Sequence, residues 1–234
     1  MDLVPLSIPR TRPLRVVGDV HGDLGAFAYA AETERFVVQL GDLVDYGPDS
    51  AGVLRVMFSL IDRGQGLFLL GNHDLKLARF LLGQKVRSNA ELAITARQMD
   101  APLRARFLVE AARAPLWVRS GHRLFVHAGF HTDMLDSPSV PMEIGRALGI
   151  HARALFGEPT GHIKDDGFPE RSLRWVSRIP PGMTVYVGHD PRSQDGRPLT
   201  QWARSGGRAI FLDTGAGKGG HLSWIDLEAE GGPG

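Results

Sequence analysis

Five segments of the chain place residue types that bind metals directly after short apolar runs. Each run is rich in Val, Leu and Phe and stops at Asp, Asn or His, most often beside a glycine. A single Gly-Asp pair would fit an ordinary turn, but five such junctions in one chain favour a shared site. The side chains that offer ligand atoms at these junctions are Asp19, His21, Asp42, Asn72, His127 and His189.

The ligand types indicate what such a site can hold. Two carboxylates, one amide oxygen and three imidazoles are too many for one tetrahedral ion and suit two ions that share Asp42. Two divalent ions bring about four positive charges, of which Asp19 and Asp42 cancel about two, so the centre would attract phosphate. Because the chain has no cysteine, thiolate ligands are excluded. We expect manganese first, and the ligand types leave iron, zinc, nickel and cobalt open.

The apolar runs are expected to be buried strands that bring the junctions together. Ligands of open α/β sheets lie beyond the carboxyl ends of the strands, where all five junctions would meet. Early strands are predicted over residues 14–17, 36–40 and 67–70, followed by helices over 24–32, 50–63 and 74–82. Later strands are predicted over residues 124–127, 184–189, 209–213 and 222–227. This order predicts an α/β fold whose later sheet is mixed and partly antiparallel.

The stretches between these elements are expected to be insertions and loops. Residues 88–113 form an Ala/Arg-rich helical pattern, and residues 140–178 are irregular, with Gly and Pro interruptions. Residues 191–207 suggest a hairpin or loop, and residues 231–234 a frayed tail. Without a linker-like segment, we expect one domain over residues 1–234.

The charge and hydropathy of the chain argue against an extended nucleic-acid partner and against a membrane partner. The chain of 234 residues has 27 basic and 26 acidic side chains, so the footprint of an extended nucleic-acid binder is missing. No run approaches the roughly 20 apolar residues of a membrane-spanning helix, and residues 1–12 lack the apolar core of a signal peptide. We therefore expect a cytoplasmic protein without a membrane partner.

The five junctions resemble the motifs of the calcineurin-like metallophosphoesterases, in particular their phosphoprotein phosphatase branch. That pattern runs GDxHG, GDxxDRG, GNHE or GNHD, H[AG]G and GH, and this chain has GDVHG, GDLVDYG, GNHD, HAG and GH. Within the branch, residues 71–129 and 155–175 look most like the phosphatase domain of bacterial polynucleotide kinase-phosphatases. The resemblance implies a four-layer α/β/β/α sandwich with mixed sheets and helical insertions.

The resemblance also assigns roles to the matching residues. It implies that Asp19, His21 and Asp42 bind the first metal, and that Asp42, Asn72, His127 and His189 bind the second. His73, paired with Asp45, would protonate the leaving-group oxygen or stabilise the transition state, because a nearby carboxylate favours the imidazolium form. The nucleophile would be a metal-bridging hydroxide that attacks phosphorus in line, without a covalent enzyme intermediate.

One motif departs from the family pattern. Tyr46 stands where the branch has arginine, and the loss of a bidentate cation should weaken binding of a monoester dianion. Two explanations remain open: another arginine compensates, or the enzyme prefers diesters whose leaving group stacks on Tyr46. The candidate replacements are Arg171, Arg174 and Arg178. Asp213, in a turn after a late strand, is expected to orient His21 or His189 from outside the ligand set.

The substrate class stays open at this point. The main expectation is a hydrolase of phosphate mono- or diesters that acts on a small molecule, a nucleotide, a nucleic-acid end or a phosphoprotein. Alternatives are a dinucleoside polyphosphate hydrolase, because residues 71–75 also look like that family, and a serine/threonine protein phosphatase. A non-catalytic binding module is disfavoured, because every ligand type and His73 are present. No kinase P-loop motif occurs in the chain.

Overall fold

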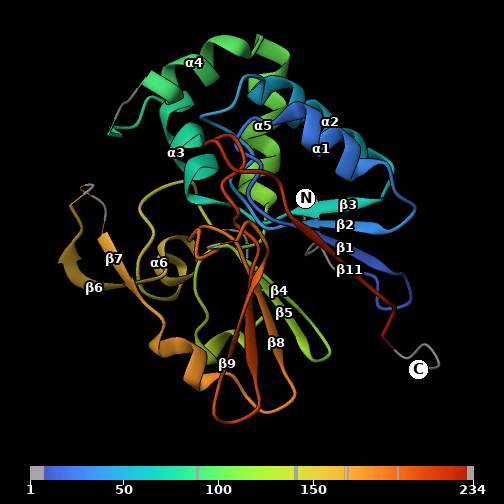
Figure 1. The fold of residues 1–234 in the computed structure, drawn as a ribbon. Coiled ribbons are helices and arrows are strands. Elements are labelled where there is room, and N and C mark those ends of the chain that lie inside the picture. Colours follow the sequence, from blue (N-terminus) through green and yellow to red (C-terminus); the bar gives the residue numbers. More distant parts are fainter. Residues whose placement is uncertain are drawn as a thin grey trace.

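Two mixed β-sheets form the centre of the molecule (Figure 1). The computed structural model describes residues 8–87, 90–139, 142–165, 167, 169–193 and 195–230. The predicted tail at 231–234 and residues 1–7 of the N-terminal segment lie outside this range. The first sheet has the strand order β11-β1-β2-β3, in which β1, β2 and β3 are parallel and β11 is antiparallel to β1. Its strands are β1 (Leu14–Val17), β2 (Phe36–Gln39), β3 (Gly66–Phe68) and β11 (Trp224–Leu227).

The second sheet has the order β4-β5-β8-β10-β9 and is also mixed. Its three inner strands are parallel, while the edge strands β4 and β9 pair antiparallel with β5 and β10. The expectation of a mixed, partly antiparallel second sheet is confirmed, but its antiparallel strands are β4 and β9, and the predicted last strand, β11, pairs with β1 in the first sheet instead. The strands are β4 (Trp117–Ser120), β5 (Arg123–Val126), β8 (Thr184–Val187), β9 (Leu199–Trp202) and β10 (Arg208–Phe211).

Alternating side chains of the strands divide the core into layers. Val16 and Val38 of the first sheet join Phe125, Tyr186 and Ile210 of the second in one buried cluster, which lies between the sheets. The residues next to them point the other way: Val17 and Val37 pack with helices, as do Val126, Val185 and Phe211. This period of two is the signature of strands covered on both faces.

Helices cover the outer faces of both sheets (Figure 1). Those on the side of the first sheet are α1 (Leu24–Ala31), α2 (Ser50–Asp62), α3 (Asn72–Leu81), α4 (Ala90–Gln98) and α5 (Ala101–Arg113). Helix α6 (Gly149–Phe156) and the 3₁₀ helix η2 (Arg174–Arg178) pack on the second sheet, where the Trp175 and Phe211 rings lie 5.9 Å apart. A shorter 3₁₀ turn, η1, spans Thr132–Met134. The arrangement confirms the expected α/β sandwich with mixed sheets and helical insertions.

Helix starts follow local capping chemistry. Asp23 accepts a hydrogen bond from the Ala26 backbone N–H at the start of α1, and Asp49 does the same for Gly52 in α2. A third aspartate, Asp100, caps α5 and separates it from α4, so the predicted helical region 88–113 is two helices. Side-chain oxygens at this position satisfy amide groups that the first helical turn leaves free.

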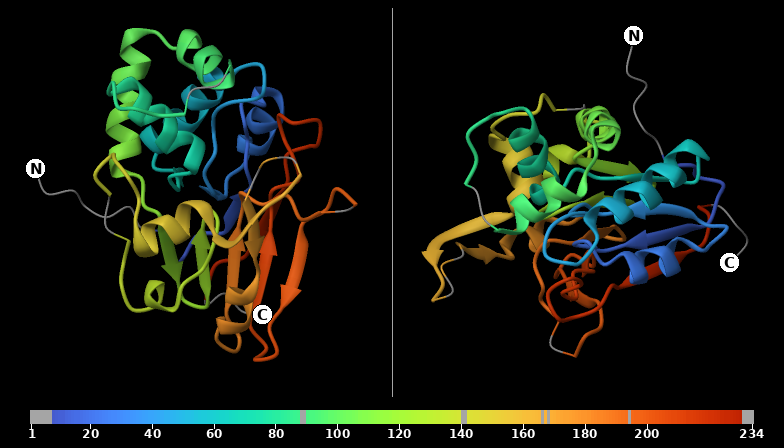
Figure 2. Two further views of the ribbon diagram at one scale, coloured as in Figure 1. Left: turned by 90° about the vertical axis from the view of Figure 1, so that its left-hand side faces the viewer. Right: turned by 90° about the horizontal axis from the view of Figure 1, so that it is seen from above.

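The region predicted to be irregular, 140–178, contains more regular structure than expected. Besides α6 and η2, it forms a hairpin of β6 (Glu158–Ile163) and β7 (Pro169–Ser172). This hairpin stands out from the body of the molecule in two directions of view (Figures 1 and 2). Its residues are mostly exposed, so it lacks the apolar alternation by which a strand is found.

Several predicted strand ends differ from the structure. Strands β2, β3, β5, β8 and β10 each stop one or two residues before the predicted end, because the following residues turn out of the ladder toward one edge of the sheets. The region 191–207 contains β9, which forms a hairpin with β10. Strand β4 was not expected. In the described part of the chain, no helix combines the length and apolarity needed to cross a membrane.

Candidate metal centre

Strand register brings the candidate ligands to one edge of the two sheets. Val17 of β1 lies opposite Gln39 of β2, and the next residues along both strands lead to Asp19 and Asp42. In the second sheet, Val187 of β8 pairs with Val126 of β5 and with Phe211 of β10. His127, His189 and Asp213 therefore leave the second sheet at the same level. The carboxyl ends of β1, β2, β5, β8 and β10 therefore meet at this edge. Ligands of open α/β sheets bind at this end of the strands.

The first group consists of Asp19, His21 and Asp42, all of them buried. His21 Nδ1 lies 3.0 Å from the Val44 carbonyl oxygen, so this nitrogen donates and Nε2 keeps its lone pair. Nε2 lies 3.7 Å from Asp19 Oδ2 and 3.8 Å from Asp42 Oδ2. Burial lowers the pKa of His21 to about 3, which keeps the ring neutral. A neutral imidazole between two carboxylates is a ligand for a cation.

The second group consists of Asp42, Asn72, His127 and His189. His127 Nδ1 lies 2.9 Å from the Leu40 carbonyl oxygen, and its Nε2 lies 3.1 Å from Asn72 Oδ1 and 3.5 Å from Asp42 Oδ1. The Nδ1 atom of His189 lies 3.1 Å from the same His127 Nε2. Burial lowers the pKa values of both histidines, so their rings are neutral at ordinary pH.

These residues fit two cations that share Asp42. In each of two triads, one ligand atom per residue lies within 4.8 Å of the others, and Asp42 belongs to both. The Nε2 atoms of His21 and His189 are buried and have no hydrogen-bond partner. Burial opposes the ionisation of Asp42, but its histidine neighbours lower its pKa below the usual range. Oxygen and imidazole donors that converge in this way suit divalent ions of hard or borderline character.

Backbone strain is concentrated at the same edge. Among the described residues, positive φ angles outside glycine occur at His21, Asp42, Asp45, Tyr46 and His189, with values from 46° to 73°. Residues other than glycine rarely adopt positive φ angles, because the Cβ atom then clashes with the backbone. Residues that do so often cluster at functional sites, where the surrounding structure holds them in place. No sequence pattern indicated this strain.

A glycine allows the two halves of the site to approach each other. A Cβ atom on Gly188 would collide with Asp19 Oδ1, the oxygen that accepts a hydrogen bond from the His189 backbone N–H at 2.9 Å. The second oxygen of Asp19 also lies 3.0 Å from this N–H. Any larger residue at position 188 would therefore push a ligand-bearing loop of the second sheet away from the first.

His73 and Asp45 form a hydrogen-bonded pair beside the two ligand groups. His73 Nδ1 lies 2.7 Å from Asp45 Oδ2, and the other Asp45 oxygen accepts a hydrogen bond of 2.9 Å from the Thr95 hydroxyl of α4. Burial lowers the pKa of His73, but Asp42 and Asp45 outweigh it, and the net shift is upward. The imidazolium form is thus favoured, which is the form that can donate a proton.

Asp74 supports the site, although no role was predicted for it. Its carboxylate is buried and accepts backbone N–H groups of Asp42 at 2.8 Å, Leu43 at 3.0 Å and Gly71 at 3.0 Å. Burial and the charge of Asp42 raise the pKa of Asp74 to about 7, against the effect of these three donors. Asp74 therefore ties the loop after β2 to the start of α3. Its position as the last residue of the GNHD motif could have indicated this role.

The residues predicted around the ligands separate into two sets. Tyr46 and Arg171 line a cavity of about 470 Å³ together with Asp42, Asn72 and His189. Arg174 and Arg178 are exposed on η2 and are not among the lining residues, so this cavity brings in only Arg171 of the three arginines. Lys164 of the hairpin region and Lys218 also line it, and neither was predicted.

Asp213 is buried at the end of β10, but it makes none of the expected contacts. Its Oδ1 accepts the Gly215 backbone N–H at 2.9 Å, and its Oδ2 is buried without a partner. The Nδ1 atoms of His21 and His189 face other groups and their Nε2 atoms have no hydrogen-bond partner, so Asp213 accepts no hydrogen bond from either ring. Burial raises the pKa of Asp213, and Lys218 counteracts this rise.

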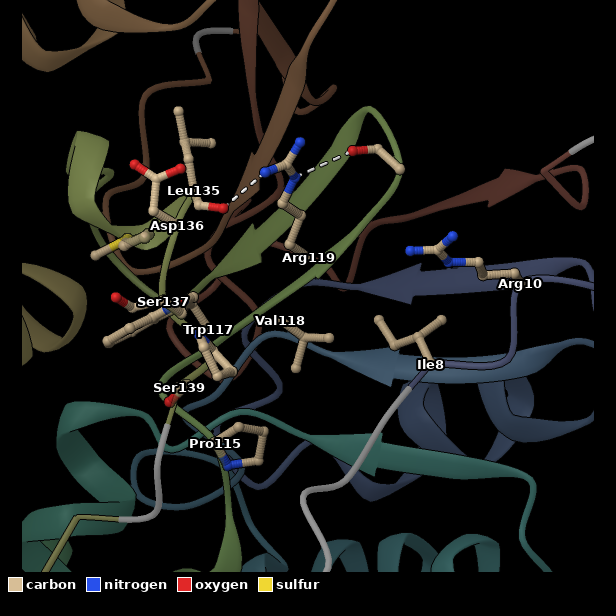
Figure 3. A pocket seen from close by; sticks show the side chains of 13 residues that line it. Ile8, Arg10, Pro115, Trp117, Val118, Arg119, Leu135, Asp136, Ser137 and Ser139 are labelled. Atoms are coloured by element: carbon tan, nitrogen blue, oxygen red, sulfur yellow. Dashed lines mark hydrogen bonds between the residues drawn. The ribbon is translucent and has the colours of Figure 1, made fainter.

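Another cavity, also of about 470 Å³, is lined by residues of β4 and of the segment 134–139 (Figure 3). There the Arg119 guanidinium donates hydrogen bonds to the carbonyl oxygens of Leu135 and Gly121. None of the six candidate ligands lines it. The site chemistry is therefore concentrated in the first cavity.

Comparisons with known proteins agree with this chemistry. Residues 12–195 match the sequence model of the calcineurin-like phosphoesterases. The bis(5′-nucleosyl)-tetraphosphatase PrpE [asymmetrical] of Geobacillus sp. strain WCH70 is 28% identical over 232 residues, covering 89% of this chain and 87% of that protein. Its namesake from Bacillus subtilis strain 168 is 28% identical over 202 residues, covering 82% and 75%.

Solved structures share the fold. A crystal structure of a candidate diadenosine tetraphosphatase superposes with a TM-score of 0.62 at 24% identity, covering 98% of both chains. A protein serine/threonine phosphatase from Saccharomyces cerevisiae superposes with a TM-score of 0.61 at 14% identity, covering 96% of this chain and 82% of that one.

Proposed function

The chain belongs to the calcineurin-like phosphoesterase family, and we propose that it hydrolyses dinucleoside polyphosphates at a centre of two divalent metal ions. Membership of the family makes it a metal-dependent phosphoesterase. The finer assignment takes up the alternative left open by the sequence, and the relatives named as bis(5′-nucleosyl)-tetraphosphatases support it. The resemblance to the polynucleotide kinase-phosphatase domain stays a prediction.

One observation carries the proposal. The cavity of about 470 Å³ that contains Asp42, Asn72 and His189 is also lined by Lys164, Arg171 and Lys218. A single phosphate group would need the metals and one cation. A chain of several phosphates carries several negative charges, and a cavity that adds three basic side chains to a metal centre suits such a chain.

The roles of the residues follow from their positions. Asp19, His21 and Asp42 would hold one ion, and Asp42, Asn72, His127 and His189 the other. When bound, the two ions supply Lewis acidity, which lowers the pKa of water and neutralises phosphate oxygens. His73 would donate its Nε2 proton to the oxygen that leaves phosphorus, while Asp45 holds the ring through Nδ1. Water thus adds across one phosphoanhydride bond, and no covalent enzyme intermediate is needed.

Manganese is the proposed metal, because mixed imidazole and carboxylate ligation suits it. Elemental analysis of protein purified without added metal tests this assignment. We expect about two ions per chain, with manganese the most abundant. A site filled by zinc or iron alone, with no gain of activity on exchange for manganese, would replace this assignment without changing the ligand set.

The substrate is tested by comparing turnover on four compounds: diadenosine tetraphosphate, p-nitrophenyl phosphate, bis(p-nitrophenyl) phosphate and a 2′,3′-cyclic nucleotide. We expect the highest kcat/KM for diadenosine tetraphosphate. Chromatography of the products then distinguishes ATP plus AMP from two ADP molecules. The Asp42→Asn variant, purified in the same way, controls for contaminating hydrolases. Faster turnover of either nitrophenyl ester would point to a general mono- or diesterase instead.

A further inference from the structure

Tyr46 occupies the position at which the family pattern carries a cation. Its ring makes an edge contact with His21, with centroids 5.0 Å apart at 89°, and a tilted contact with His73 at 5.2 Å. Its backbone has a φ of 66°. The ring is thus held against a metal ligand and the proton donor, but it brings no positive charge to the phosphate.

A lysine from a distant part of the chain approaches this ring. Lys218 Nζ lies 4.7 Å from the centroid of Tyr46, within the range of a cation–π interaction. In the described part of the chain, the ammonium finds no hydrogen-bond or ion-pair partner. Lys218 also lines the cavity that contains Asp42, Asn72 and His189, which places it beside the candidate metal ligands.

The loop that carries Lys218 is fixed by its own hydrogen bonds. The Asp213 carboxylate accepts the Gly215 N–H at 2.9 Å, and the Gly215 carbonyl accepts the N–H groups of Lys218 at 3.0 Å and Gly220 at 2.9 Å. Gly217 has a φ of 70°, and a Cβ atom there would collide with the His21 carbonyl oxygen. The loop therefore packs directly on the segment of His21, which determines where Lys218 emerges.

We propose that Lys218 binds substrate phosphate in place of the arginine that the family carries at position 46, and that Tyr46 acts as a positioning residue for its ammonium. The proposal deepens the proposed function and rests on it for the identity of the substrate. An arginine grips one phosphate with a planar fork, whereas an ammonium on a flexible stem is a point charge that can follow successive phosphates. Together with Arg171 in the same cavity, Lys218 would favour a phosphate chain over a singly charged diester.

The test compares Lys218→Met, Lys218→Arg and the double variant Tyr46→Arg/Lys218→Met. KM and kcat are measured for diadenosine tetraphosphate and for bis(p-nitrophenyl) phosphate, which carries one negative charge. A charge-assisted hydrogen bond corresponds to about 10- to 100-fold in affinity. We expect Lys218→Met to raise KM for the tetraphosphate by about that factor, and to raise KM for the diester much less. Lys218→Arg should recover most of the loss, and so should the double variant, because it restores the arginine of the family pattern.

Binding, metal content and folding are measured on the same proteins. The affinity of the metal-loaded enzyme for inorganic phosphate should fall with Lys218→Met, while its metal content and melting temperature stay at the wild-type values. Lys85→Met, which changes an exposed lysine outside the cavity, is the matched control and should behave as wild type. Equal KM changes for both substrates, or no KM change with Lys218→Met, would overturn the proposal.

Failure of the proposed function would be recognised separately. If the wild type does not cleave diadenosine tetraphosphate, that function is wrong, and the Lys218 proposal is judged on p-nitrophenyl phosphate, a dianion, against the singly charged diester. A larger KM increase for the dianion would still support Lys218 as the phosphate-binding cation. Equal increases would overturn it.

Discussion

At the scale of single residues, the histidine that we propose as the proton donor stands apart from the proposed metal ligands. His73 contacts Asp45 through Nδ1 and lies beside His21 with ring centroids 5.0 Å apart, yet it belongs to neither ligand triad. Its neighbours Asp42 and Asp45 outweigh burial and raise its pKa, whereas burial lowers the pKa of His21. The surroundings thus favour the protonated ring of His73 and the neutral ring of His21, although the two rings are in contact. A protonated ring suits a proton donor, and a neutral ring suits a metal ligand.

His73→Asn is expected to show how strongly the leaving group depends on proton donation. General acid catalysis contributes about 10²- to 10⁴-fold for poor leaving groups. We expect kcat to fall by such a factor for an alkyl phosphate and far less for a nitrophenyl ester, whose oxygen leaves without protonation. Steady-state kinetics on both substrates measure the difference, and metal content verifies that the centre is intact. An equal loss on both substrates would contradict proton donation by His73.

Asp74→Asn is expected to weaken the loop that presents Asp42. The carboxylate accepts three backbone N–H groups, and an amide would turn its own N–H₂ group toward at least one of them. A buried donor left unpaired costs about 1–3 kcal/mol. For a chain of this size we expect the melting temperature to fall by about 3–10 °C. Calorimetry in the presence of a chelator removes the contribution of metals, and Asp136→Asn, at an exposed carboxylate, is the control.

At the scale of elements, the insertion that carries α4 contributes to the site. Helix α4 (Ala90–Gln98) is not part of either sheet, but its Thr95 is buried and donates to Asp45, and the Thr95 and Ser50 hydroxyl oxygens lie 3.3 Å apart. The region was predicted to be a helical insertion over one edge of the sheet, and none of its residues was predicted to belong to the site. Its contact with Asp45 depends on how α4 packs against α2 and α3, which local sequence does not encode.

Thr95→Val tests this contribution, because the substitution keeps the shape and removes the hydroxyl. Groups that orient an active-site residue from behind typically change activity by about 10- to 100-fold. We expect kcat to fall by about tenfold with an unchanged KM and unchanged metal content, since Asp45 would lose one of its two side-chain partners. Thr95→Ser retains the donor and should stay within about threefold of the wild type. If both variants lose activity equally, the hydroxyl is not what matters.

At the scale of the whole molecule, the candidate metal centre joins the two sheets. Asp19 and Asp42 come from the first sheet, and His127 and His189 from the second. Burial and the neighbouring carboxylates of Asp213 and Asp42 raise the pKa of Asp19, so the protein without metal gathers acidic groups that repel one another when ionised. Cations that bind only the folded state relieve this repulsion and stabilise the fold.

Removal of the metals is therefore expected to lower stability as well as activity. At a free metal concentration of 100 times Kd, one site adds about 2.7 kcal/mol to the free energy of unfolding. We expect a chelator to lower the melting temperature by about 5–10 °C per site, followed by recovery when manganese is added back. Asp42→Asn, which removes the shared ligand, should make the melting temperature nearly insensitive to chelator. The same chelator shift in Asp42→Asn and wild type would contradict the shared-ligand assignment.

Sequence by itself determined the fold class and the candidate ligands. The apolar runs predict buried strands, and the Asp, Asn and His residues that follow them directly are types that bind metals. Strand β1 was predicted to the residue, and the pairing of His73 with Asp45 was expected. The roles of these residues, and the single domain, stay predictions.

Only the tertiary structure decided which side chains from distant segments reach the site. The sequence around Lys218 and Thr95 did not indicate that either residue reaches the site, because a lysine in a glycine-rich loop and a threonine in a helix are both common. Three arginines looked alike in sequence, yet of these only Arg171, on β7, lines the cavity, whereas Arg174 and Arg178 are exposed on η2. The positive φ angles at five site residues arise from packing between loops of both sheets. Contacts over such separations depend on the arrangement of whole elements, which no local pattern contains.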